Sequence, residues 1–141
     1  MLIQLLSDLH NEFLRNSHSS LNHKWLGSIP MTDADIIVLA GDIDTGTQGV
    51  EWAIEESKRL GKIIIYILGN HEFYRQEYHS LLKKVADLCD NTNVFLLNKN
   101  SIEINKVRFL GVTLWTDYAV SNTAQDLAMN CAKQQLADHR L

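Results

Sequence analysis

Residues 62–72 read KIIIYILGNHE, and this segment contains the pattern that decides the fold. Its apolar run ends abruptly at Gly69-Asn70, which is typical of a strand buried on both faces of a sheet. Two earlier runs end in the same way: residues 2–7 stop at Asp8, and residues 35–40 stop at Gly41-Asp42. We therefore expect three buried strands, each followed directly by polar side chains.

Helical patterns lie between and after these strands. Residues 49–60 carry apolar side chains on one face and end before Gly61, and residues 76–89 show the same spacing more strongly. Strands that alternate with helices indicate an α/β fold with a mainly parallel sheet. We also expect a loop over 11–34 that could include a helical turn at 21–26, and a fourth strand over 93–98. A hairpin of 101–105 and 107–115 should turn at Asn105-Lys106. A last helix should begin after Asn122 or Thr123 and end near Ala137.

The spacing of the strand ends predicts a site. Asp8 and Asp42 are 34 residues apart, and Asp42 and Asn70 are 28 apart, so each interval fits one strand–crossover–strand unit. Crossovers of one hand keep the strands parallel. All three side chains should then leave the sheet at its carboxyl edge, where open α/β sheets bind ligands.

The residue types at this edge suit divalent cations. In an extended chain Asp8 and His10 point to the same side, so a carboxylate and an imidazole can hold one cation together. Asp42 can bridge two cations, and Asn70 offers a neutral amide oxygen next to the titratable His71. Mixed oxygen and imidazole ligands favour Mn, Fe, Zn or Co over Mg alone. Each piece also has a plainer interpretation, since Asp at a strand end is often a turn former or a helix cap.

Taken together, Asp8-x-His10, Gly41-Asp42 and Gly69-Asn70-His71-Glu72 resemble the first three signature blocks of the calcineurin-like metallophosphoesterases. The resemblance covers roughly residues 1–115 and implies an α/β/β/α sandwich. It implies that Asp8, His10 and Asp42 ligate a first metal ion, and that Asp42 and Asn70 ligate a second. The expected cofactors are therefore two divalent ions, with Mn favoured.

The resemblance also implies a reaction, the hydrolysis of a phosphomonoester or phosphodiester by a hydroxide held between the two metals. His71, beside the phosphate, would donate a proton to the leaving oxygen or stabilise the transition state, and Asn70 would also contact the substrate. Glu72 would either orient His71 or cap the following segment. Arg15, in the loop after the first block, is a candidate phosphate contact, with a surface role as the alternative.

The family pattern continues with a later His and a Gly-His-x-His block, from which this sequence departs. After His79 the next His is His139, without a preceding Gly or a second His. The second metal site would keep two protein ligands and could stay empty. We therefore expect residues 1–141 to form one domain, the N-terminal part of a longer metallophosphoesterase domain, with impaired turnover. The alternative is a non-catalytic metal- or phosphate-binding module, or a subunit completed by another chain.

Composition narrows the partners and the location. The 141 residues carry a net charge of −4, which does not favour a nucleic-acid partner, although a nuclease subunit with a local basic patch remains the rival hypothesis. Cys89 and Cys131 suggest reduced thiols, and neither a signal peptide nor a membrane-spanning run is expected, so we predict a cytoplasmic protein. The alternating apolar residues of 102–115 predict a face for a second sheet, and hence a homo-oligomer or a complementing C-terminal chain.

Overall fold

The structure is a computed structural model that describes residues 1–16, 27–119 and 124–136. Its centre is a four-stranded sheet of parallel strands in the order β1-β2-β3-β4. The strands are β1 (Ile3–Leu6), β2 (Ile36–Ala40), β3 (Ile63–Ile67) and β4 (Val94–Leu96). The sequence prediction of an α/β fold around a parallel sheet is confirmed.

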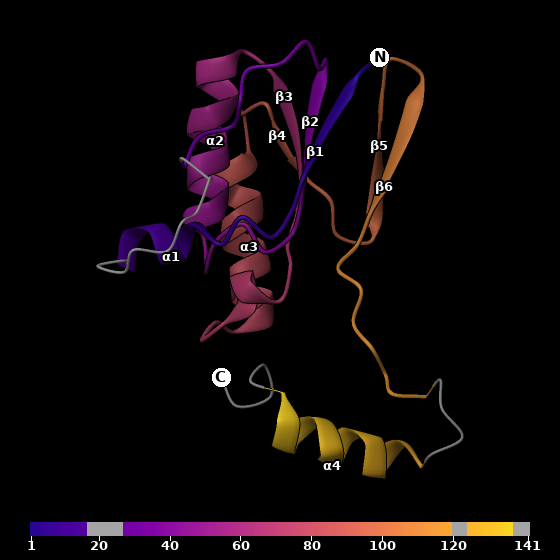
Figure 1. The fold of residues 1–141 in the computed structure, drawn as a ribbon. Coiled ribbons are helices and arrows are strands. Elements are labelled where there is room, and N and C mark those ends of the chain that lie inside the picture. The colour runs from indigo at the N-terminus through magenta and orange to yellow at the C-terminus, as the bar shows by residue number, and fades with distance from the viewer. Residues whose placement is uncertain (17–26, 120–123, 137–141) are drawn as a thin grey trace.

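Helices α2 (Gln48–Leu60) and α3 (Tyr78–Cys89) cover one face of this sheet (Figure 1). Their buried side chains, among them Val50 and Leu81, pack against sheet residues such as Leu39 to form the main core. Helix α2 ends as its sequence indicates, because Gly61 takes the left-handed conformation (φ 64°) and its N–H donates to the Ser57 carbonyl.

An antiparallel hairpin of β5 (Asn100–Ile104) and β6 (Val107–Gly111) lies against the other face (Figure 1). Asn105 and Lys106 form the predicted turn, and both have positive φ, as a two-residue hairpin turn with right-handed strand twist requires. The layers of the described residues are therefore helix, sheet and hairpin. The second core lies between the sheet and the hairpin, and its members are Ile36, Ile65 and Leu97, with Val38, Ile63, Ile67, Ile102, Ile104 and Phe109 packed around them.

Three features differ from the sequence prediction. A short helix, α1 (Asn11–Asn16), replaces the start of the expected loop, while the suggested turn at 21–26 lies outside the described residues. Strand β6 stops at Gly111 instead of residue 115, because the chain then leaves the hairpin and the Thr113 hydroxyl donates to the Leu68 carbonyl at 2.5 Å. A 3₁₀ turn, η1 (His71–Phe73), follows β3.

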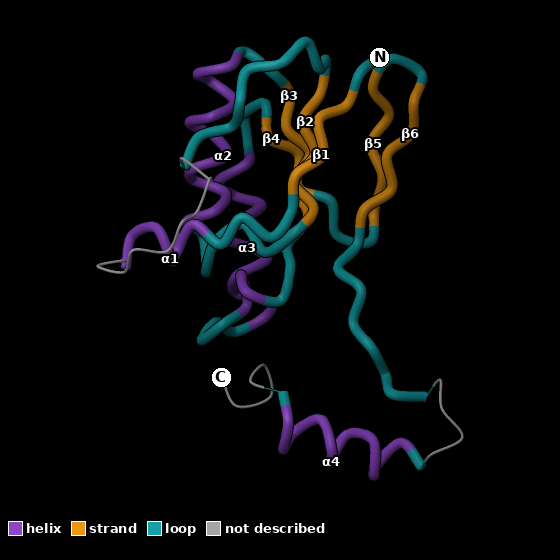
Figure 2. The backbone as a smooth tube through the Cα atoms, viewed as in Figure 1, coloured by secondary structure: helices purple, strands orange, loops and turns teal. Residues whose placement is uncertain are grey.

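The last predicted helix is present as α4 (Gln125–Gln135), which begins after Ala124. The proposed caps Asn122 and Thr123, and the expected end at Ala137, lie outside the described residues. Helix α4 stands apart from α2 and α3, beyond the carboxyl ends of the sheet strands (Figure 2). None of the described helices is long and apolar enough to cross a membrane.

Strand β1 lies at an edge of the sheet and keeps apolar side chains exposed. Ile3 pairs with Ile36 and Leu5 with Val38, so all four face the hairpin side of the sheet. Ile36 and Val38 are covered in the second core, whereas Ile3 remains 47% and Leu5 67% exposed. The described part of the hairpin therefore leaves the apolar face of β1 uncovered.

Candidate metal centre

The segments that follow β1 and β2 run side by side beyond the sheet. The N–H groups of Asp8 and His10 donate to the carbonyls of Gly41 and Asp42 at 3.0 and 3.1 Å, and Asn11 N–H donates to the Ile43 carbonyl at 2.9 Å. These bonds continue the pairing of the two strands into their loops. They bring the residues after two separate strands to one place at the carboxyl edge, as the spacing predicts.

Three candidate ligands in these loops have an unusual backbone. Asp8, His10 and Asp42 have φ values of 54°, 49° and 55°, in the left-handed region that non-glycine residues rarely adopt. The expected extended backbone at Asp8 and His10 is therefore wrong, although their ligand atoms do lie close together. Tight left-handed turns bring their side chains together instead, and such strained residues persist where surrounding contacts enforce them.

The first predicted ligand set is assembled. Ligand atoms of Asp8, His10 and Asp42 all lie within 4.8 Å of one another. Asp8 is exposed, and His10 and Asp42 are half-buried, so an ion could enter from solvent. Two carboxylates and one imidazole are a suitable donor set for a first-row divalent metal ion. The residues present therefore fit the cation that the sequence predicts.

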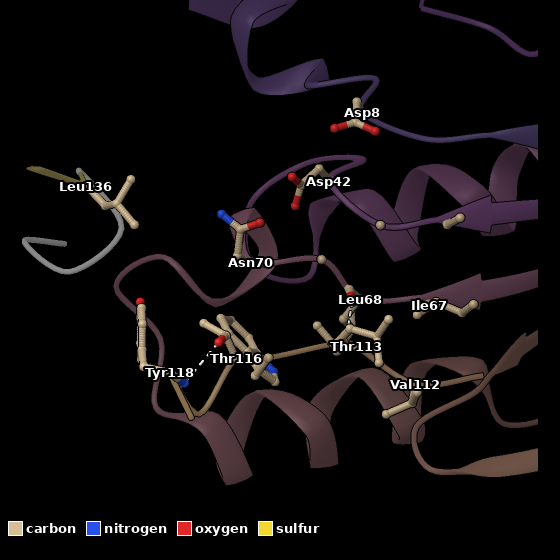
Figure 3. A pocket seen from close by; sticks show the side chains of 15 residues that line it. Asp8, Asp42, Ile67, Leu68, Asn70, Val112, Thr113, Thr116, Tyr118 and Leu136 are labelled. Carbon is tan, nitrogen blue, oxygen red and sulfur yellow. Dashed lines mark hydrogen bonds between the residues drawn. The ribbon is translucent and has the colours of Figure 1, made fainter. Parts of the chain in front are cut away.

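Asp42 also connects this set to the segment after β3. Its Oδ1 accepts the backbone N–H of His71 at 3.0 Å. The neighbouring Asn70 projects into the same cavity as Asp8 and Asp42 (Figure 3), and its Nδ2 donates to the Tyr74 hydroxyl at 3.2 Å. The three strand ends thus contribute to one site.

Two glycines allow the loops to approach this closely. A Cβ on Gly41, which has φ 91°, would lie 2.9 Å from the Cα of Gly69. A Cβ on Gly69 would collide with the carboxylate and the backbone nitrogen of Asp42. Only residues without a side chain fit at these two positions, which explains the Gly that precedes Asp42 and the Gly that precedes Asn70.

Glu72 has a role that neither sequence alternative anticipated. Its side chain is fully buried, and its carboxylate accepts the N–H groups of Asp42 (3.2 Å), Ile43 (2.9 Å) and Gly69 (2.8 Å) and the hydroxyl of Tyr66 (2.9 Å). Burial raises the pKa of Glu72, although these hydrogen bonds oppose the shift. Glu72 thus ties the loop after β2 to the loop after β3 from beneath the site, instead of orienting His71 or capping a segment.

Glu12, on α1, is the site residue that sequence reasoning missed. Its Oε1 lies 2.9 Å from Nδ1 of His71 and 3.2 Å from Nδ1 of His10. The two imidazole rings meet edge to face with their centroids 4.3 Å apart. A signal existed in the sequence, since Glu12 follows His10 by two residues, but the expected loop gave no reason to place it beside His71.

A cavity of about 610 Å³ opens next to the candidate ligands (Figure 3). One wall is formed by the strand ends with Asp8, Asp42 and Asn70, and the opposite wall by residues 112–116 and Tyr118. Leu136, which follows α4, also lines the cavity. Arg15 lies in α1, but its side chain is outside the described part of the structure. His18, His23 and His139 are also outside the described residues.

Comparison with known proteins places the chain among relatives of one family. Residues 1–130 match the family model of the calcineurin-like phosphoesterases. An uncharacterized protein of Acanthamoeba polyphaga mimivirus is 26% identical over 131 residues, which cover 86% of this chain and 47% of that protein. The crystal structure of a phosphopantetheinyl hydrolase from Mycobacterium tuberculosis superposes with a TM-score of 0.64 at 18% identity, over 96% of this chain and 51% of that one. The chain thus spans about half the length of the relatives it matches.

Proposed function

The chain belongs to the calcineurin-like phosphoesterase family, and from this premise we propose that it binds two divalent cations, with Mn favoured, and hydrolyses a phosphoester at the carboxyl edge of its sheet. The observation that carries the proposal is the convergence of Asp8, His10 and Asp42, whose ligand atoms lie within 4.8 Å of one another. Asp8 and His10 follow one strand and Asp42 follows another. A binding site explains why these donors meet next to an open cavity better than chance does.

Each residue has a defined task in this proposal. Asp8, His10 and Asp42 would hold one cation, and Asp42 with Asn70 a second. Bound cations of this kind lower the pKa of a coordinated water and neutralise the charge of the phosphate. The backbone N–H of His71 donates to the Asp42 carboxylate, and this bond supports a position of His71 beside the proposed ligands. There it would hold a proton for the leaving oxygen or stabilise the charge of the transition state.

The cavity wall supplies surfaces for the rest of the substrate. Trp115 is 56% exposed, and its ring meets that of Phe73 edge to face, with the centroids 5.7 Å apart. Tyr118 lines the same wall (Figure 3). An aromatic wall facing a metal site suits an ester whose leaving group is planar or apolar. Arg15 remains a proposed phosphate contact, and the cytoplasm remains the proposed location.

Among the described residues, the proposed second cation would have fewer protein ligands than the first. We propose that residues 1–141 are the N-terminal part of a longer domain, whose remaining ligands come from another segment or another chain. The alignments support this proposal, because this chain covers only about half the length of each of the two relatives. The exposed apolar face at Ile3 and Leu5 also supports it. The same observations favour a second candidate function, a metal- or phosphate-binding module without turnover.

Hydrolysis of a chromogenic phosphomonoester and of a matching phosphodiester, each with and without Mn²⁺, separates the two functions. The test compares the 141-residue chain with Asp42→Asn. Metal-dependent turnover that Asp42→Asn abolishes supports the phosphoesterase. Mn²⁺ binding without turnover of either ester, also in the presence of an added C-terminal half from a relative, would instead support the binding module.

A further inference from the structure

A single carboxylate oxygen, Glu12 Oε1, contacts two histidines of the site: Nδ1 of His71 at 2.9 Å and Nδ1 of His10 at 3.2 Å. We propose that Glu12 is a positioning residue that fixes the tautomer of both imidazoles, with the proton on Nδ1 and Nε2 left to meet the cation and the phosphate. The use of these tautomers in catalysis rests on the proposed function, whereas the contacts of Glu12 do not depend on it.

Burial makes these contacts specific. The Glu12 side chain is 10% exposed, and those of His10 and His71 are 25% and 19% exposed, so water competes little for the carboxylate. An ionised carboxylate can only accept hydrogen bonds. Each imidazole must therefore donate its Nδ1–H to Glu12, because a lone pair on Nδ1 would face the negative oxygen. In a neutral ring, Nε2 is then the nitrogen that keeps a lone pair.

The two rings have different needs for that lone pair. His10 is a candidate metal ligand, and a metal-bound imidazole commonly donates its other N–H to a carboxylate, which fixes the ring and raises its basicity as a ligand. His71 is the candidate group beside the phosphate, where a fixed ring orientation decides which atom reaches the leaving oxygen. One residue would thus align the metal ligand and the phosphate-side histidine together.

The backbone places Glu12 firmly. The N–H groups of His10 and Asn11 bond to the carbonyls of Asp42 and Ile43 at 3.1 and 2.9 Å, and Phe13 N–H donates to the His10 carbonyl at 3.0 Å. The start of α1 is therefore fixed to the loop after β2. The carboxylate reaches both rings from a rigid segment and not from a free surface side chain.

The other carboxylate oxygen indicates that stability alone does not explain Glu12. Oε2 is buried and has no hydrogen-bond partner among the described residues. A buried acceptor without a partner destabilises the folded state. A residue that only fills space in the core would not need a buried oxygen without a partner. If Glu12 instead holds two N–H groups with Oε1, the unpartnered Oε2 follows from that geometry.

The experiment reads the tautomers directly, without relying on turnover. Long-range ¹H–¹⁵N NMR of the metal-free chain, above the ordinary pKa of histidine, distinguishes Nδ1–H from Nε2–H rings. We expect the Nδ1–H form for both His10 and His71 in the wild type. Glu12→Ala removes the acceptor from both rings, so at least one of them should change to Nε2–H. The matched control is Glu51→Ala, at a side chain whose carboxylate accepts from the Thr47 hydroxyl on the exposed start of α2.

Calorimetric Mn²⁺ titration gives the second readout. Glu12→Gln should weaken Mn²⁺ binding about 10- to 100-fold without changing its stoichiometry, as loss of an outer partner of a metal ligand does. Glu12→Asp, which keeps the charge, should restore part of the affinity and serves if Glu12→Gln does not fold. Unchanged tautomers in a folded variant, or the loss of a whole Mn²⁺ equivalent, would overturn the proposal, the latter because Glu12 would then be a ligand. If the tautomers change as expected but the wild type hydrolyses no ester, the proposed function fails and the positioning role stands.

Discussion

Glu72 accepts the backbone N–H of Asp42 at 3.2 Å through Oε2, from a position where its own side chain is fully buried. The same oxygen accepts Gly69 N–H at 2.8 Å. A carboxylate in the protein interior therefore holds the two loops that carry Asp42 and Asn70. The candidate site is positioned by the core beneath it and not only by contacts at its surface.

Replacing Glu72 by Gln should destabilise the protein strongly. A glutamine can present its oxygen to some of the four donors, but its amide nitrogen then faces a backbone N–H. Each buried donor left unsatisfied costs about 1–3 kcal/mol, so we expect a loss of at least about 2 kcal/mol in the free energy of unfolding. Urea unfolding measures this loss. Glu55→Gln, at an exposed side chain, is the control, and equal stability of the two variants would contradict the role given to Glu72.

Glu56 should make stability depend on pH. Its Oε2 accepts Ile29 N–H and an Arg59 N–H, both at 2.6 Å. Burial pushes the pKa of Glu56 upward, but the hydrogen bonds from Arg59 and Ile29 and the charge of Arg59 outweigh it and leave the pKa below its ordinary value of 4.5. The ionised group therefore stabilises the fold above pH 4.5, and this contribution is lost as the pH falls through the lower folded-state pKa.

Glu56→Gln should accordingly lower the free energy of unfolding by about 1 kcal/mol at pH 7, mainly because a neutral amide accepts the Ile29 hydrogen bond more weakly. The difference from the wild type should shrink below pH 4.5. Urea unfolding at a series of pH values measures it. A difference that grows on acidification would mean that the sign assigned to this shift is wrong.

His71→Asn should lower turnover and spare metal binding. In the proposal His71 lies beside the phosphate and outside the ligand set of Asp8, His10 and Asp42, although its ring also forms a second group of potential ligand atoms with His10 and Glu12. Removal of one proton donor or charge stabiliser typically lowers rates by about 10²- to 10⁴-fold. The assay should use whichever form is active, the chain alone or the chain with an added C-terminal half from a relative. The control is His79→Asn at an exposed position of α3. An equal drop in metal occupancy would show that His71 is itself a ligand.

The apolar face of β1 should cause association of the isolated chain. Leu5 is 67% exposed on an edge strand, and such edges pair with other chains. We expect light scattering to detect oligomers or aggregates of the wild type, and Leu5→Lys to shift the population toward monomer. Leu127→Lys, on the exposed side of α4, is the control. A wild-type monomer at high concentration would rule out an adhesive β1 face.

The strands and their polar ends were predictable from sequence, because buried parallel strands form apolar runs that end abruptly. Each predicted strand of the sheet appears within a few residues of its expected bounds. Gly41 and Gly69 could be placed in turns, although their contact across two loops depends on the tertiary structure. The end of β6 could not be foreseen, because the bond from Thr113 to Leu68 spans 45 residues.

The contacts of Glu12 and Glu72 could not be predicted from the sequence, for a physical reason. Both are charged residues that the fold buries, and their partners come from distant segments: His71 for Glu12, and Asp42 for Glu72. Charged residues are usually exposed, so no sequence pattern assigns them to an interior. The ligands at the strand ends carry a positional signal, whereas the residues that support them do not.

Calorimetric titration of Mn²⁺ into the wild-type chain, Asp42→Asn and Asp87→Asn tests the central claim most directly. Asp42 belongs to the assembled ligand set, whereas Asp87 lies exposed on α3, far along the chain from the site. We predict saturable binding to the wild type, the same affinity for Asp87→Asn, and a loss of more than about 100-fold for Asp42→Asn, beyond what loss of an outer partner costs. Equal affinity of all three proteins, or the absence of saturable binding to the wild type, would contradict a metal centre at the carboxyl edge of this sheet.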